Sequence, residues 1–132
     1  MAEALGNCTP AEHGGPMKIP EKFVSLHPYF QVHPGNLEEF LAGLPDFARV
    51  TATEEKNLFY DFTVNGDEVF CREGYDGAEA LLTHLENVGA LLGEALKIAS
   101  LSRLEVHGPA TELDKLRAPL AHLQPQWFVR TS

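Results

Sequence analysis

Hydrophobic and polar residues alternate along the segment FVSLHPYFQV, residues 23–32, in the pattern of a strand with one buried face. The apolar residues on alternate positions, which share one face of a strand, are Val24, Leu26, Phe30 and Val32. Pro28 interrupts the pattern, because proline has no backbone N–H to donate to a neighbouring strand. The segment therefore predicts a strand with a bulge or an edge contact at Pro28.

In the next segment, PGNLEEFLAGLPDFARVTATEE, the apolar residues recur at the spacing of an amphipathic helix. Asn36 and Glu39 form a capping-box pattern at its start. Pro45 lies inside the helical pattern and predicts a kink, or a division of the helix in two.

Residues 57–75, NLFYDFTVNGDEVFCREGY, have the pattern of a β-hairpin. Two runs rich in β-branched and aromatic residues flank Asn65-Gly66-Asp67, where Asn-Gly supplies the positive φ angles of a tight turn.

The rest of the chain predicts two further helices and a strand. Asp76, with Glu79 as a second capping box, opens a helix that Gly89 and Gly93 weaken and are expected to bend. The segments that follow are a strand over residues 100–108, a shorter helix over residues 110–123 and an extended tail over residues 124–130.

The resulting order, strand-helix-strand-strand-helix-strand, is the split βαβ arrangement of an α+β, ferredoxin-like βαββαβ fold. Right-handed crossovers place both long helices on one face of a four-stranded antiparallel sheet, with an extra C-terminal helix beside it. The other face of the sheet is left uncovered. A second copy of the chain is the simplest cover for that face, so we expect a homodimer.

Length and composition favour one soluble domain. The 132 residues divide into a flexible N-terminal arm, residues 1–20, and a single domain, residues 21–132, with its C-terminal helix and tail. A net charge of −9 argues against nucleic acid and anionic membranes as partners. No apolar run is long enough for a membrane span, and no signal-peptide pattern is present, so we expect a cytoplasmic protein.

Four segments together carry a resemblance to a known family: VHPGNLEEFLAGL, TATEEKNLFYDF, CREGY and EALLTHL. In their order and spacing the chain resembles the antibiotic biosynthesis monooxygenases, over roughly residues 23–107. The resemblance implies a dimeric α+β barrel. It has departures: Tyr75 stands where tryptophan is common, and a second histidine is missing, with Asn87 nearby.

The resemblance also implies an activity. Members of this family oxidise phenols, quinols or related polycyclic compounds with molecular oxygen, without flavin or metal, and a subset resembles haem-degrading enzymes. We therefore expect a cofactor-independent monooxygenase that acts on a phenolic or quinol-type aromatic. The alternative is a non-catalytic dimeric barrel that binds a small apolar ligand or serves as an interaction module.

His84 is the candidate catalytic residue. A step of about 100° per residue puts it about 60° from the centre of its helix's apolar stripe, and the resemblance implies a functional histidine in this helix. A neutral imidazole there can accept a phenolic proton. The alternative is an ordinary histidine at the boundary of the helix. The residues expected to bind substrate are Tyr60, Arg72 and Tyr75.

Each of these three has an alternative reading. Tyr60 is either a pocket wall or part of the core, and core is favoured. Arg72 either binds an anionic substrate or forms a salt bridge, and the salt bridge is favoured. Tyr75 lies at the turn into a helix, where a phenol can guard the mouth of a pocket.

The sequence gives little sign of a metal site or of paired carboxylates. It contains no His-Glu-x-x-His and no Cys-x-x-Cys, and its two cysteines, Cys8 and Cys71, lack metal-type spacing. No cluster of paired carboxylates is evident in the sequence. We therefore expect neither a metal nor a cofactor.

Overall fold

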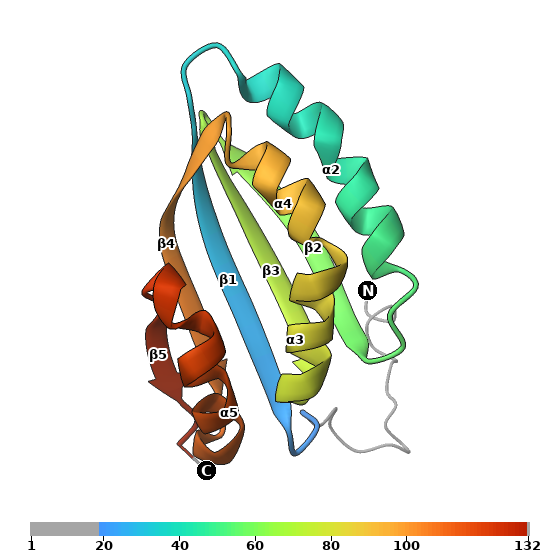
Figure 1. Cartoon of the computed structure of the whole chain (residues 1–132), viewed down its shortest axis with the longest axis vertical. Coiled ribbons are helices and arrows are strands. Elements are labelled where there is room, and N and C mark those ends of the chain that lie inside the picture. Colours follow the sequence, from blue (N-terminus) through green and yellow to red (C-terminus); the bar gives the residue numbers. More distant parts are fainter. Residues whose placement is uncertain (1–18, 132) are drawn as a thin grey trace, which may run out of the picture.

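The computed structural model describes residues 19–131, in which a twisted sheet carries helices along it (Figure 1). Residues 1–18 of the expected N-terminal arm lie outside the described residues. The elements in chain order are β1 (Phe23–Val32), α2 (Leu37–Thr51), β2 (Asn57–Asn65), β3 (Glu68–Asp76), α3 (Ala78–Asn87), α4 (Gly89–Ala95), β4 (Ala99–Gly108), α5 (Ala110–Leu120), η2 (Ala121–Leu123) and β5 (Gln126–Val129).

The sheet has five strands in the order β2-β3-β1-β4-β5. The first four pair antiparallel in the ferredoxin-like arrangement, as predicted. The prediction of a plain four-stranded antiparallel sheet was wrong, because β5 adds to β4 in parallel, with Val106 opposite Trp127. Only four residues of the tail form this strand, too few to show alternation in the sequence.

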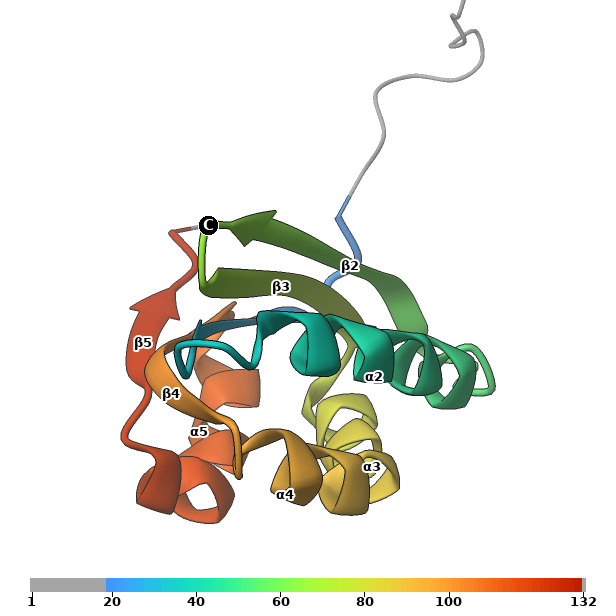
Figure 2. The same ribbon diagram turned by 90° about the horizontal axis from the view of Figure 1, so that it is seen from above.

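Over residues 19–131 the helices lie on one side of the sheet and leave its other face without a helix, as Figure 2 shows from above. The uncovered face predicted from the crossover rule is therefore present in the protomer. Aromatic and imidazole rings lie close together on the uncovered face. Tyr29 contacts Phe70 with 4.6 Å between ring centroids, and His107 stacks on Phe128 at 4.4 Å. The opposite, helix-covered face holds the core.

Pro28 lies in the middle of the sheet, since β1 pairs with both β3 and β4. The pairing of β1 with β4 shifts register between Tyr29 and Phe30, directly after the proline. The predicted bulge is confirmed, and the alternative of an edge strand is wrong. Tyr29 pairs with Arg103 and Phe30 with Leu101, so the extra residue is Ser102 and the bulge lies on β4, next to Pro28.

Helix α2 continues through Pro45 without a division. Its predicted capping box has a different geometry: the Asn36 side chain donates to the Glu39 carboxylate at 3.2 Å, and it does not cap a backbone N–H. The helix still begins next to Asn36, at Leu37, where the apolar periodicity places it.

The second long helix is broken into α3 and α4 at Val88, whose φ and ψ are −100° and 5°. Gly89 follows the break directly, so the predicted weakness of this position shows as an interruption. At the start of α3, Gly77 has φ of 107°, a conformation that side-chain-bearing residues rarely adopt. This glycine turns the chain from β3 into α3 within one residue.

The start of α3 is capped from another helix. The predicted capping box at Asp76 and Glu79 does not form, because Asp76 still belongs to β3. Instead Glu112 of α5, which is 4% exposed, accepts a hydrogen bond of 2.9 Å from the Ala78 N–H. A carboxylate at a helix N-terminus also interacts favourably with the helix dipole. This contact ties α5 to α3.

The core consists of two clusters of buried residues. One packs α3 and α5 against β1, β3 and β4, and includes Leu81, Leu113 and Leu116. The other packs α2 against the opposite end of the sheet, and includes Phe30 and Phe40. The two clusters meet beneath the break between α3 and α4. None of the helices described over residues 19–131 is long and apolar enough to cross a membrane.

We expect Glu112→Ala to lower the free energy of unfolding by about 1–3 kcal/mol, because it leaves the buried N–H of Ala78 without its acceptor. Urea titration checks this value. The control is Asp114→Ala, which removes an exposed ion pair on the same helix and leaves the unfolding midpoint nearly unchanged. Equal losses in the two variants would contradict this role for Glu112.

Candidate functional site

The imidazole of His84 lies buried between two carboxyl groups, and its residue is only 1% exposed. Its Nδ1 is 3.1 Å from both oxygens of Glu54, and its Nε2 is 3.3 Å from Oε1 of Glu73. The three residues come from α3, from the turn between α2 and β2, and from β3. A His84 ring held on both nitrogens has a fixed orientation and a fixed tautomer.

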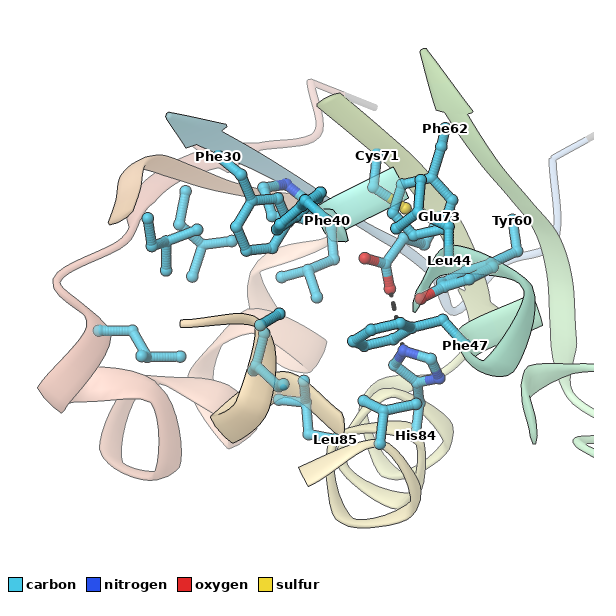
Figure 3. Close-up of a pocket in the computed structure, with 18 of the residues that line it drawn as sticks. Phe30, Phe40, Leu44, Phe47, Tyr60, Phe62, Cys71, Glu73, His84 and Leu85 are labelled. Atoms are coloured by element: carbon cyan, nitrogen blue, oxygen red, sulfur yellow. Dashed lines mark ion pairs between the residues drawn. The ribbon is translucent and has the colours of Figure 1, made fainter. Parts of the chain in front are cut away.

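Glu54 determines where His84 carries its proton. A carboxylate can only accept hydrogen bonds, so the proton of the neutral ring lies on Nδ1, facing Glu54. Asn87 holds the other side of Glu54 by donating from Nδ2 to Oε2 at 3.0 Å. The lone pair of Nε2 then points toward Glu73, along the contact drawn as a dashed line in Figure 3.

Glu73 is the acid of this arrangement. Burial raises the pKa of its carboxyl to about 7, although hydrogen bonds from Tyr75 and Cys71 oppose the rise. The Tyr75 hydroxyl donates to Oε1 of Glu73 at 2.7 Å. Burial also lowers the pKa of His84, against the attraction of Glu54. Both shifts favour the neutral pair, with a proton on Glu73 and none on Nε2 of His84, 3.3 Å away.

A cavity of about 50 Å³ opens beside this pair, between the helices and the sheet. Its walls are almost entirely apolar and come from both core clusters; Phe30, Phe40, Leu44, Phe47 and Phe62 are among those labelled in Figure 3. The polar side chains that line it are Tyr60, Cys71, Glu73 and His84. An acid and a base therefore face an apolar space, where electrostatic interactions are stronger than in water.

The other polar groups of the cavity are neutral. Burial and the neighbouring Glu73 raise the pKa of the Cys71 thiol far above its ordinary value, and the same two causes raise the pKa of Tyr60. A cysteine nucleophile acts as a thiolate, so Cys71 is unsuited to that role at neutral pH. Proton transfer by Glu73 and His84 is the chemistry that this set of groups supports.

A second pocket, of about 420 Å³, lies on the outer side of Glu54. Its walls are polar and include Glu54, Thr83 and Asn87. Glu54 therefore borders a surface pocket on one side and holds Nδ1 of His84 on the other. This position gives the buried imidazole a path for proton exchange with solvent that does not cross the apolar cavity.

The structure brings together three of the four site residues predicted from the sequence. The ring of His84 lies 5.2 Å from that of Tyr60 and 5.1 Å from that of Tyr75, measured between centroids. Tyr60 lines the cavity, whereas Tyr75 is wholly buried behind Glu73 and does not stand at a pocket mouth.

Arg72 does not join them. Its side chain lies on the uncovered face of the sheet, where it pairs with Asp61 at 3.0 Å and stacks over Phe70. Arg72 therefore forms a salt bridge, which is the alternative that the sequence favoured. Within this protomer Arg72 has no contact with the cavity lining.

Sequence reasoning missed both carboxyl groups, and the expectation of no paired carboxylates was wrong. Glu54 and Glu73 are far apart in the chain and meet only through His84. The sequence does contain an indication of Glu73. Alternate residues of a strand face the same side, and Glu73 alternates with the buried residues Val69, Cys71 and Tyr75, so its carboxyl faces the core. An ionisable group at such a position indicates a perturbed pKa.

Metal chemistry has no evident ligand set in the part of the chain that the structure describes. Over residues 19–131, no group of three or more His, Cys, Asp or Glu side chains is arranged to hold a metal ion.

Comparisons with known proteins show which solved structures share this fold. Scans against protein-family models and curated proteins returned no match. A candidate antibiotic biosynthesis monooxygenase from Nitrosomonas europaea is 12% identical with a TM-score of 0.61, over 71% of this chain and 96% of its own. One from Chloroflexus aurantiacus is 17% identical with a TM-score of 0.56, over 67% and 93%. The predicted resemblance to these monooxygenases is confirmed at the level of the fold.

A more specific relationship is to MupZ from Pseudomonas fluorescens. Its crystal structure is 43% identical to this chain with a TM-score of 0.81, over 84% of this chain and 92% of MupZ. The chain belongs to the same protein family as MupZ.

We expect Glu73→Gln to change the pH dependence of stability. The pKa of Glu73 is about 7 in the folded protein against an ordinary value of 4.5, so between these pH values the unfolded chain alone ionises. The free energy of unfolding of the native protein therefore falls as pH rises through this window, by up to about 3 kcal/mol. The neutral glutamine has no such loss, so the variant gains stability relative to the native protein up to pH 8, as urea titrations measure.

Glu112→Gln is the matched control. A hydrogen bond from Ala78 lowers the pKa of Glu112, so its stabilisation is present above the ordinary value and is lost as pH falls. The two variants should diverge in opposite directions with pH. A Glu73→Gln curve parallel to that of the native protein would contradict a neutral, buried Glu73.

Proposed function

We propose that this protein is an enzyme that performs acid–base chemistry on a largely apolar substrate whose reactive group lies in the cavity, with Glu73 as the acid and His84 as the base. The observation that carries the proposal is the buried Glu54–His84–Glu73 arrangement at the wall of an apolar cavity. Strongly shifted pKa values beside a cavity are typical of catalytic groups.

The two groups can serve a substrate in one step. Glu73 donates its proton to a substrate oxygen, while Nε2 of His84 takes a proton from a hydroxyl or from a carbon next to a carbonyl. Glu54 stabilises the imidazolium that forms, as the carboxylate of a catalytic triad does. The imidazolium then returns a proton to Glu73 across their 3.3 Å contact, which restores the starting state.

Two reaction classes use this site differently. In a redox-neutral reaction, such as an isomerisation, a hydration or the addition of a hydroxyl group, the acid and the base are both needed. In the cofactor-independent oxygenation of a phenol or quinol, the base forms a substrate anion that reduces molecular oxygen. The paired acid favours the first class, and the fold shared with antibiotic biosynthesis monooxygenases favours the second.

Substrate panels under air and under nitrogen separate these classes. One panel holds phenols and hydroquinones, and the other holds hydroxy-ketones and enones. We expect turnover that continues under nitrogen, with a product mass that is unchanged or increased by one water. Glu73→Gln and His84→Gln should each lower kcat about 10²–10⁴-fold, the usual effect of removing a general acid or base.

Glu112→Gln is the control, since Glu112 is a buried carboxyl that lies outside the cavity. Oxygen-dependent turnover with one oxygen atom gained would assign the protein to the second class. Turnover unaffected by both site variants would contradict the proposed roles. Saturable binding without turnover would favour a non-catalytic ligand-binding protein, which is the alternative drawn from the sequence.

We further propose that the protein works in the cytoplasm as a homodimer closed through the uncovered face of the sheet. The support is the row of rings on that face, together with exposed Phe59 and Phe128, each 41% exposed. An apolar surface of this kind is typical of an interface between subunits.

We expect Phe70→Lys to dissociate the dimer. Phe70 lies within the row of rings and beneath Arg72, so a second cation there repels its own copy across a two-fold axis. Sedimentation velocity measures the species present at micromolar concentration. Leu96→Lys on the helical side is the control and should leave the dimer intact. A native protein that sediments as a monomer would contradict the proposed dimer.

A further inference from the structure

A groove on the helical side of the molecule runs next to the catalytic cavity. It measures about 430 Å³ and lies between α3 and α4 on one side and α5 and η2 on the other, the two groups of helices that stand apart in Figure 1. Its floor and walls are mainly apolar. The exposed side chains of Glu86 and His122 stand at the groove.

The groove and the cavity have walls in common. Four leucines line both of them: Leu85, Leu92, Leu120 and Leu123. Only Leu120 is fully buried, at 1% exposed, and the other three are half-buried. The partition between the groove and the cavity is therefore a single layer of leucine side chains, one each from α3, α4, α5 and η2.

The cavity alone is too small for a ring. Its volume of about 50 Å³ holds roughly four water molecules, whereas benzene occupies an apolar cavity of about 150 Å³. A slim group fits beside Glu73 and His84, but the body of a larger substrate has to lie elsewhere. The groove is the adjoining space, since four leucines line both it and the cavity.

We propose that the four leucines form the passage through which the substrate enters, and that the substrate is an elongated aliphatic molecule. Its polar reactive end lies at Glu73 and His84, its chain passes between the leucines, and its far end emerges in the groove near Glu86 and His122. This inference rests on the proposed function for the identity of the reacting end, and it deepens that proposal by naming the class of substrate.

Charge and shape both support this occupant. The shared walls carry no charged group, so the segment that crosses them has to be apolar, and each methylene transferred from water to such a wall contributes about 0.8 kcal/mol. The polar side chains at the groove suit a substrate whose far end carries a hydrogen-bonding group. A compact polycyclic ring matches neither the slim cavity nor the leucine layer.

Binding of 1-alkanols from butanol to decanol, measured by calorimetry, tests the passage without knowledge of the substrate. We expect the affinity to rise about fourfold per methylene, the fold-change that corresponds to about 0.8 kcal/mol. Phenol and 2-naphthol serve as compact probes and should bind more weakly than decanol. No alkanol binding, no rise with chain length, or tighter binding of the rings would each overturn the proposal.

A bulky label attached to the folded protein tests whether the ligand passes between the four leucines. Leu123→Cys is labelled with a bulky maleimide in a chain that also carries Cys8→Ser, while Cys71 is buried and protected. The label should abolish the gain in affinity with chain length. Leu96→Cys, which lines neither space, is labelled in the same way as the control and should keep that gain.

The outcomes separate this proposal from the others. If the affinity still rises with alkanol chain length when position 123 is labelled, the proposed passage is wrong. A label there that dissociates an oligomer would make the groove an interface between copies, and would also overturn it. Glu73→Gln should bind alkanols with an unchanged gain per methylene, so a failure of catalysis and a failure of the passage are read from different measurements.

Discussion

One proton between Glu73 and His84 is the constraint on which the site depends. Two buried ionisable groups on an apolar wall are costly when charged, and the shared proton keeps both of them neutral. The arrangement needs support on each side: Tyr75 donates to Glu73, and Glu54 holds Nδ1 of His84. The supporting groups come from strand, helix and turn, so the ferredoxin-like fold is what brings them together.

The same fold leaves space for the chemistry. A continuous second helix would carry its apolar stripe straight across the sheet, but the break at Val88 divides it into α3 and α4 over the junction of the two core clusters. Glu112 fixes the start of α3 from α5, whereas His84 lies near the other end of this helix, close to the break. Rigid placement of the acid and base beside a deformable leucine wall is the combination that a site needs in order to admit a substrate and still orient it.

The strands were the most predictable part, because alternation is a direct consequence of their geometry, and the exception, β5, is too short to alternate. His84 was predictable from its place at the edge of a helical stripe and from the family resemblance. Its partners were not, because they are joined by tertiary packing. The alternation of side chains along β3 could have placed two of these residues from the sequence alone. It puts Glu73 with the buried residues of β3, and it puts Arg72 opposite Asp61 on the outer face, away from any pocket under the helices.

Protons and substrate reach His84 from different sides. Glu54 meets the polar pocket that contains Asn87, so the imidazole exchanges protons with water there. The proposed leucine passage opens into the cavity that His84 and Glu73 line, so the substrate arrives through an apolar layer. Because the imidazolium returns its proton directly to Glu73 in the proposed cycle, resetting the base requires no water in the cavity. A dry cavity preserves the raised pKa of Glu73, and that pKa is what makes a carboxyl group an acid at neutral pH.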